Sequence, residues 1–321
     1  SLMEILKNSE TLSLSGTSGS LTSTLNNLNW FNLSFDNGYF NADSFNIAPL
    51  QSIEGYKIKK AFNQDYLAIS GGKVTGGPFN PVRYGRDTIL SVRGLQFNDA
   101  KLLTFKDKRQ TDTAQQEKPL FTTLIRHIPQ KLDIDSLALK NMYVEYWEIN
   151  PKTDTLGIVP VSELNVLMTN IRNHNLKDED SLYILASASV LNQLFTKLEV
   201  QESYKDSLGG FLMKLQTGPM NLKQFNEILI PLEAIKVLRG NLSRLSLEAV
   251  ANNNYSTGKM HMYYKGLVLR LMNKNDFERQ NFGNRLLSWL ANSLVVRKNN
   301  NGKEATVFFE RIKNKSAINF L

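Results

Sequence analysis

The chain has 321 residues, of which 41% are hydrophobic; it contains 17 Phe and no Cys, and its formal net charge is +8. This composition excludes a largely disordered chain, and the lack of Cys excludes disulfides, thiolate metal sites and cysteine nucleophiles. No run approaches about eighteen apolar residues, and the first residues lack a basic start with an apolar core. We therefore expect no membrane-spanning helix or signal peptide in the sequence as given, a soluble character, and an origin within a longer protein.

The positive charge is concentrated at the C-terminal end. From Lys259 onward the chain has twelve Lys and Arg against four Asp and Glu, a balance of +8, which leaves the first 258 residues neutral overall. A basic end can meet nucleic acid or anionic lipid head groups, but a solvated basic surface explains it better. Aromatic residues beside basic ones, as in 263–265 and 308–311, also arise from strand alternation, so we expect no nucleic-acid partner.

Alternating apolar residues predict strands along most of the chain, with few helices. The predicted strands lie within 12–47 and at 66–70, 87–107, 132–148, 164–168, 182–186, 195–200, 211–215, 235–249, 258–272, 294–297 and 306–312. Helices are predicted at 119–128, after an Asn221 cap and before Pro231, and at 284–293. Residues 49–62 fit either a helix or a strand, 71–77 read as a turn, and 108–118 as a loop.

One unit of the chain recurs. Residues Leu132–Glu148 hold two alternating runs on either side of Lys140 and Asn141, which predicts a strand, a tight turn and a returning strand. The same pattern occurs 42 residues earlier, where Leu90, Val92, Leu95, Phe97, Ala100, Leu102 and Phe105 match Leu132, Ile134, Leu137, Leu139, Met142, Val144 and Trp147. A fainter copy has Asp36 and Asn37 in its turn. Repetition of one unit predicts a sheet that grows by adding similar strands.

The excess of strands over helices defines the expected fold class. It is mainly β: an extended, curled antiparallel sheet built from strand–turn–strand repeats, with three or four short capping helices. So few helices cannot cover both faces of the sheet. Two arrangements therefore stay open, a sandwich or barrel that buries the apolar face, and a trough whose apolar wall takes up something else. Periodicity alone favours the sandwich.

Catalytic and metal constellations are absent from the sequence pattern. The three histidines are isolated and lack metal-ligand spacing: His127, His174 and His261. The carboxylates at 178–180 suit a solvated loop, and we find no acid/base pair. The glycine cluster 71–77 lacks the Gly-Lys-Ser/Thr ending of a phosphate loop. We expect no enzyme, no catalytic residues, no metal and no cofactor.

The C-terminal two thirds resemble a known family. The residues that carry the resemblance are IDSLALKNMYVEYWE at Ile134–Glu148, SLGGFLMKLQTGPMNLKQFNEILIPL at Ser207–Leu232, RGNLSRLSLEA at Arg239–Ala249, GKMHMYYKGLVLRLMNK at Gly258–Lys274, LANSLVVRKNNNG at Leu290–Gly302 and VFFERI at Val307–Ile312. They resemble the C-terminal region of an uncharacterised branch of the AsmA-like proteins of the Gram-negative envelope. The resemblance extends from about residue 87 to the end and is weak before it.

The resemblance implies a location and a role. Members are held in the inner membrane by one N-terminal helix and carry a long β-rich body in the periplasm, and relatives form hydrophobic β-grooves proposed to move phospholipid. This favours the trough over the sandwich. The expected division is an N-terminal β segment, 1–110, continuous with an AsmA-like region, 111–321. We expect a non-enzymatic periplasmic segment that binds phospholipid or another acyl-chain lipid in outer-membrane or envelope biogenesis.

Strand alternation supplies candidate site residues for that groove. The groove candidates share one expected sheet face: Met142, Val144, Tyr146, Leu245, Leu247, Met260, Met262 and Tyr264. The head-group candidates are the nearby cations Arg244, Lys265 and Arg270. An alternative from another class is a scaffolding β-protein that binds envelope proteins through exposed sheet edges. A hydrolase is a distant third, since it would need polar side chains converging in a deep pocket.

Overall fold

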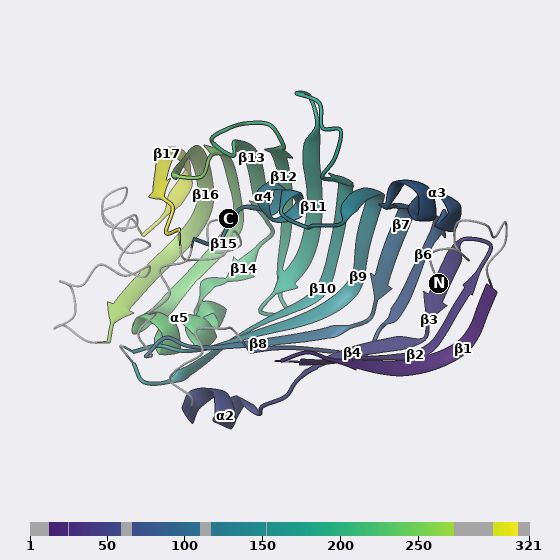
Figure 1. The fold of residues 1–321 in the computed structure, drawn as a ribbon. Helices are drawn as coiled ribbons and strands as arrows, with labels where there is room; N and C mark the ends of the chain where they lie inside the picture. The colour runs from purple at the N-terminus through teal and green to yellow at the C-terminus, as the bar shows by residue number, and fades with distance from the viewer. Residues whose placement is uncertain are drawn as a thin grey trace.

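The computed structural model describes residues 13–24, 26–58, 66–109, 117–151, 153–272 and 298–313. They form one 17-stranded sheet with short helices at its margins (Figure 1). The strands are β1 (Ser13–Thr22), β2 (Asn26–Asp36), β3 (Tyr39–Ala42), β4 (Ser44–Pro49), β5 (Tyr66–Ser70), β6 (Lys73–Phe79), β7 (Ile89–Asn98), β8 (Lys101–Asp107), β9 (Lys131–Ile149), β10 (Leu156–Arg172), β11 (Ser181–Val190), β12 (Leu194–Ser203), β13 (Phe211–Thr217), β14 (Met220–Asn221), β15 (Ile235–Ala251), β16 (Tyr255–Leu271) and β17 (Asn300–Glu310). The helices are α2 (Ile53–Ile58), α3 (Pro81–Asp87), α4 (Phe121–Arg126), the 3-10 helix η1 (Leu222–Phe225) and α5 (Asn226–Glu233).

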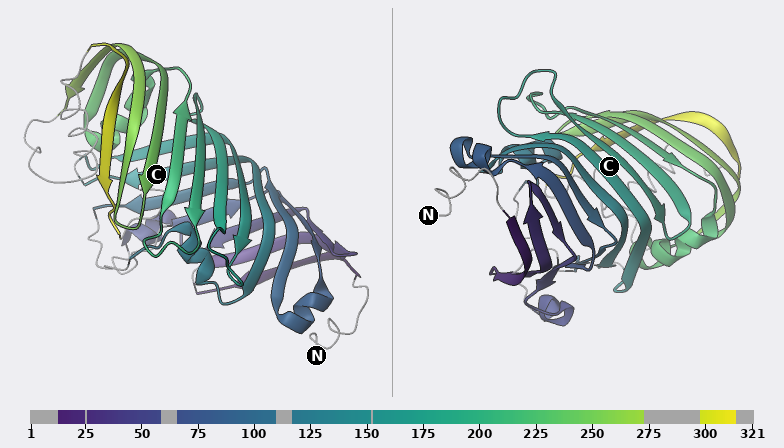
Figure 2. Two further views of the ribbon diagram at one scale, coloured as in Figure 1. Left: turned by 90° about the horizontal axis from the view of Figure 1, so that it is seen from above. Right: turned by 90° about the vertical axis from the view of Figure 1, so that its right-hand side faces the viewer.

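The sheet curls without closing into a barrel (Figure 2). From β9 to β17 the strands form an antiparallel meander, in which β13 and the short β14 both pair with β15. On the other side of β9 come β7 and β8, then β6 and β5, then β3 and β4, and finally β2 and β1. Because β7 and β8 run parallel to β9, the expected antiparallel sheet is in fact mixed. Strands β1 to β8 therefore belong to the same sheet as the later strands.

The 42-residue repeat is present in the fold, but the predicted turn between its two strands is wrong. β9 is one continuous strand, and Asn141 forms a bulge in it with left-handed backbone (φ 51°). The earlier copy, β7 with β8, runs parallel beside β9, and each residue faces the one 42 positions later, as Leu90 faces Leu132. The repeat thus places matching residues side by side. Only the fainter copy forms a true hairpin, through Asn37 and Gly38.

Backbone irregularities are aligned on neighbouring strands. Asp99 between β7 and β8, Asn141 in β9 and Glu163 in β10 have φ values of 56°, 51° and 52°. The side-chain amide of Asn141 donates to Asp99 Oδ1 at 2.6 Å, and the backbone N–H of Asn141 donates to Asn165 Oδ1 at 3.1 Å. Asparagine and aspartate tolerate this left-handed backbone better than most residues. Their polar groups also bond the backbone groups that a bulge leaves out of the ladder.

The row of backbone irregularities continues through the N-terminal strands. Gly71 and Gly72 separate β5 from β6 with φ values of 73° and 90°. Asn32 of β2 also has left-handed backbone, with a φ of 49°. Its Nδ2 donates a hydrogen bond at 2.6 Å to Oδ2 of Asp43, the residue between β3 and β4. We call Asn32, Asp43, Gly71, Gly72, Asp99, Asn141 and Glu163 the crease.

The crease bends the sheet into two walls. Figure 1 shows β3, β6 and β7 upright, whereas β4 and β8 lie across the bottom. The upper wall comprises β3, β6, β7, residues 131–140 and 164–172, and the strands from β11 onward. The lower wall comprises β4, β5, β8 and residues 142–149 and 156–162. The rings of Phe97 on β7 and Phe45 on β4 lie 5.5 Å apart across the crease.

The helices occupy the margins of this sheet. The ambiguous segment after Pro49 contains α2, which lies below the lower wall (Figure 1). The predicted cap is confirmed, since Asn221 accepts a hydrogen bond from the N–H of Lys223 at 3.0 Å. The predicted stop at Pro231 is wrong, because α5 passes through it and ends at Ala234, which has left-handed backbone. A proline near the end of a helix removes one hydrogen bond without preventing the last turn.

Some predictions fall on residues that the structure does not describe. The predicted helix at 284–293 and strand at 294–297 lie outside the described residues, as does most of the loop 108–118. Among the helices of the described residues, none has the length and apolar character needed to cross a membrane.

The bulge at Asn141 leads to a stability prediction. Asn141→Val forces a β-branched residue into left-handed backbone, which we expect to lower the free energy of unfolding by about 2 kcal/mol relative to Asn141→Gly. Urea unfolding of both variants measures the difference. Asn41, a β3 residue with ordinary strand backbone, is the control: there the Val variant should be the more stable one. Equal stability of the two variants at 141 would contradict the account of the bulge.

Candidate functional site

One face of the sheet carries rows of apolar residues that cross most of its strands. Partners across a strand pair share a face, so the register defines rows of side chains that run across the strands. Row A crosses the upper wall from β1 to β17 and consists of Leu14, Phe35, Phe40, Gly76, Leu95, Leu137, Met168, Ile184, Val200, Met213, Ala249, Gly258 and Val307. Row A contains no polar side chain.

Two further rows have the same character. Row B, nearer the crease, consists of Ala42, Val74, Phe97, Leu139, Val166, Ala186, Leu198, Leu215, Leu247, Met260 and Ala305. Row C crosses the lower wall and continues onto the neighbouring strands at both of its ends; it consists of Leu21, Leu28, Ile47, Ile69, Leu102, Val144, Val161, Val190 and Leu194. The three rows lie on the inside of the bend, since Phe97 of row B meets Phe45, which shares the face of row C. We call this side the concave face.

The opposite, convex face is mostly polar beside these rows. The convex row between rows A and B consists of Asn41, Thr75, Gln96, Ala138, Leu167, Leu185, Glu199, Lys214, Glu248, Lys259 and Thr306. Lys214 pairs with Glu248 at 3.9 Å and Lys259 with Glu304 at 3.2 Å on this face. The two faces of the sheet therefore differ sharply in polarity.

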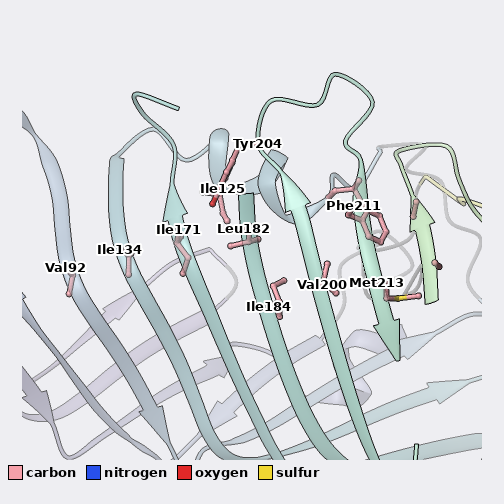
Figure 3. Close-up of a cluster of buried hydrophobic side chains, with 13 residues drawn as sticks. Val92, Ile125, Ile134, Ile171, Leu182, Ile184, Val200, Tyr204, Phe211 and Met213 are labelled. Atoms are coloured by element: carbon pink, nitrogen blue, oxygen red, sulfur yellow. The ribbon is translucent and has the colours of Figure 1, made fainter. Parts of the chain in front are cut away.

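The concave face is covered only at its margins by the described helices. All described strands belong to one sheet, so no second sheet of described residues packs on it as in a sandwich. In Figure 1, α3 and α4 lie along the upper ends of the strands and α5 along the lower end. Ile125 of α4 joins the buried cluster of the upper wall, whose side chains Figure 3 shows on neighbouring strands. Phe97, Val144 and Val161 are half-buried, and Leu67, two residues from Ile69 of row C, is 39% exposed.

The eight groove candidates all lie on the concave face, in two groups. Leu245 faces Met262 and Leu247 faces Met260 across β15 and β16, in the predicted register. Met142, Val144 and Tyr146 follow the bulge in β9. Strands β10 to β13 lie between the groups, so the two groups share a face without forming one contact site.

The candidates differ in burial. Tyr264 is only 1% exposed and packs in a cluster with Leu222 of η1 and Leu267. Met142 and Met260 are buried as well. The remaining five are half-buried. These five are therefore the candidates with surface left for a ligand: Val144, Tyr146, Leu245, Leu247 and Met262.

The three head-group candidates lie on the convex face. Arg244 faces Tyr263 and stacks on its ring at 4.1 Å from the centroid. Lys265 faces Asn241, and Arg270 faces Lys236. Each of these cations is adjacent in sequence to a residue whose side chain lies on the concave face. Because side chains alternate along a strand, the cation points to the convex face. The structure therefore does not bring the predicted cations together with the predicted groove residues.

Sequence reasoning missed most of the lower wall. Ile69, Leu102 and Val161 of row C, and Leu67 beside them, were not singled out as site residues. The 42-residue repeat could have identified part of this surface, because it aligns Leu102 with the groove candidate Val144.

The histidines form no common site. His261 Nδ1 lies 3.1 Å from the carbonyl of Gly302, and its Nε2 lies 3.6 Å from Glu304. His127 ends α4 and, with Arg126 and Tyr204, lines a cavity of about 350 Å³. Within the described part of the chain, no group of three or more His, Asp or Glu side chains could hold a metal ion.

A buried carboxylate attaches α4 to the concave face. Glu202 of β12 is 1% exposed, and its Oε1 accepts hydrogen bonds from the backbone N–H of Thr122 at 2.9 Å and from its hydroxyl at 2.6 Å. Glu202 thus caps the first turn of α4, whose own N-cap residue, Leu120, makes no side-chain bond. Burial raises the pKa of Glu202, against the opposing effects of these hydrogen bonds and of Arg311.

The comparisons with known proteins add no relative. Neither the protein-family models nor the curated proteins match the chain.

The raised pKa of Glu202 leads to a pH prediction. Its folded pKa lies above the unfolded value of about 4.3, so its contribution to stability is complete below that value and is lost as pH rises through the folded pKa. The free energy of unfolding of the unmodified chain, minus that of Glu202→Gln, should therefore increase as pH falls from about 7 to about 4. Denaturant unfolding at several pH values measures it.

Glu199→Gln is the control for this experiment. Glu199 lies on the same strand as Glu202, three positions earlier, and is exposed on the convex face. The same pH trend in both variants would show that the effect does not come from Glu202.

Proposed function

We propose that the concave face binds the acyl chains of phospholipid or a similar lipid, without catalysis. The observation that supports this most directly is the set of three rows without a charged side chain, on the inside of a single bent sheet. A folded protein gains free energy by covering such a surface, at about 0.8 kcal/mol for each buried CH₂ group. An acyl chain offers a series of CH₂ groups and needs no hydrogen-bonding partner along its length.

The dimensions of the face suit long apolar ligands. Adjacent strands are about 4.8 Å apart, so the eight steps of row C cover roughly 38 Å and the twelve steps of row A roughly 58 Å along the curved sheet. One leaflet of a bilayer has a hydrocarbon thickness of about 15 Å. Each row therefore exceeds an acyl chain in length, which suits several lipids or the movement of one lipid along the face better than a closed pocket for one molecule.

The resemblance of Ile134–Glu148 and the later segments to AsmA-like proteins supports the same role. On this proposal the chain is the periplasmic region of an AsmA-like protein whose parent is anchored in the inner membrane, and it acts in outer-membrane or envelope biogenesis. Head groups would stay at the open side of the bend, away from Arg244, Lys265 and Arg270.

A second candidate function is a scaffold for envelope proteins. It is favoured by exposed apolar side chains on the otherwise polar convex face, where Leu212 faces Val250 and Phe308 stacks with Tyr255 at 5.8 Å. Leu212, Val250 and Phe308 are 51%, 58% and 60% exposed. Exposed apolar surface of this kind marks protein contacts in many soluble proteins.

Lipid retention tests the first proposal. Native mass spectrometry of the freshly purified chain, followed by organic extraction, should find phospholipid or fatty acid in reproducible amount. A mass without ligand that persists after incubation with phospholipid vesicles would contradict lipid binding and favour the scaffold.

A matched pair of leucines locates the bound lipid. We expect Leu67→Asp, on the concave lower wall, to reduce retained lipid several-fold, because a carboxylate beside row C must be desolvated when an acyl chain lies there. Leu185→Asp makes the same chemical change on the convex face, where Leu185 is 51% exposed, and should leave retention unchanged. Equal loss in both variants would place the lipid elsewhere.

A further inference from the structure

A cluster of charged side chains lies on the concave face at the outer end of β9. Glu148 follows Val144 of row C by four residues, so strand alternation places both side chains on the same face. Lys106 faces Glu148 across β8 and β9, just as Leu102 faces Val144. The lower wall therefore changes from apolar at row C to charged at its outer end, roughly 13 Å further along the strands.

An ion pair and a hydrogen bond hold this cluster together. Glu148 is 3% exposed, and its Oε2 lies 2.6 Å from the ammonium of Lys108. The hydroxyl of Tyr146 donates to the same carboxylate oxygen. On the β10 side, Gly157 is opposite Glu148, and Leu232 of α5 lies so close that a Cβ on Gly157 would be 2.4 Å from it. The carboxylate is thus enclosed, whereas the side chain of Lys108 is 30% exposed.

Stability alone is a weak explanation for this cluster. A buried ion pair is often no more stabilising than an apolar pair of similar volume, because both charges lose their hydration. What the cluster provides is a cation at a fixed place on the concave face. An ammonium has three N–H donors, and Glu148 takes one of those of Lys108. Because the side chain of Lys108 is partly exposed, it can also donate to an anion at the outer end of this face.

We propose that Lys108 binds the phosphate of a phospholipid whose acyl chain enters row C. Glu148 and Tyr146 are positioning residues, because they hold the ammonium on the concave face. Lys106 adds a second cation on the same face.

The surface between the cluster and row C suits the start of an acyl chain. Leu67, Thr104, Tyr146 and Val159 face one another there across four neighbouring strands. Three of these side chains offer apolar surface, so polarity falls from the cluster toward row C as it falls from the head group to the tail of a phospholipid. This inference rests on the lipid proposal, and it adds which lipids bind and at which end of the lower wall their phosphate lies.

Competition between two lipids tests the phosphate site. Short-chain phosphatidylglycerol and diacylglycerol with the same acyl chains differ only in the phosphate-containing head group, and native mass spectrometry measures how much of each the chain binds from an equimolar mixture. We expect the unmodified chain to bind about tenfold more phosphatidylglycerol, because a charge-assisted hydrogen bond favours it. In Lys108→Gln/Glu148→Gln the preference should fall to about twofold or less, since the variant removes the cation without leaving a buried charge unpaired.

Lys101→Gln is the matched control. Lys101 begins β8, the strand that leads to Lys108, and it is exposed on the convex face, where it faces Tyr143. Its replacement should leave the preference unchanged. Lys108→Arg keeps a cation at the site and should retain most of the preference.

The outcomes separate this inference from the lipid proposal. An unchanged preference in the double variant would overturn the phosphate site. Displacement of the lipid by inorganic phosphate alone would also overturn it, because the site would then bind phosphate independently of acyl chains. Equal binding of both lipids by the unmodified chain would overturn the site and leave the lipid proposal standing, whereas binding of neither would contradict the lipid proposal itself. Partial unfolding of a variant lowers both amounts together, so it cannot imitate a loss of preference.

Discussion

The left-handed residues of the crease are the constraint on which the rest of the structure depends. A wide sheet with one apolar face would have to bury it under a second layer or expose it on a nearly flat surface. Aligned irregularities at Asp99, Asn141 and Glu163 instead bend the sheet toward that face. The hydrogen bond from Asn141 to Asp99 joins two neighbouring irregularities, and the amide of Asn165 accepts the backbone N–H of Asn141. The bend therefore brings apolar surfaces of both walls together, as the contact of Phe45 with Phe97 shows.

The sequence predicted the strands better than their connections. Alternation located most strands, and the 42-residue offset proved to be the register of a parallel pair. The hairpin interpretation failed because a bulge and a tight turn favour the same residues: both need left-handed backbone, and Asn141 suits either. What separates the two is whether the chain reverses after the polar pair, which depends on pairing with β8 and β10 and not on the local residues.

The predicted groove residues share one face of the sheet, but they differ in burial and include few residues of the lower wall. Alternation places Leu245, Leu247, Met260 and Met262 on one face without any tertiary information, and their register followed from the hairpin length. Burial did not follow, because Tyr264 is covered by η1, a segment more than thirty residues away in sequence. The predicted cations lie on the other face for a simpler reason: Arg244 directly precedes Leu245, and adjacent strand residues point to opposite faces.

A one-layer sheet has an apolar face and two edges, and in this chain the two features meet at β1. Rows A and C end in Leu14 and Leu21, whose exposure exceeds that of most residues within the rows. A ligand that lies along row C would reach this edge and extend beyond it, since nothing polar in the row stops it.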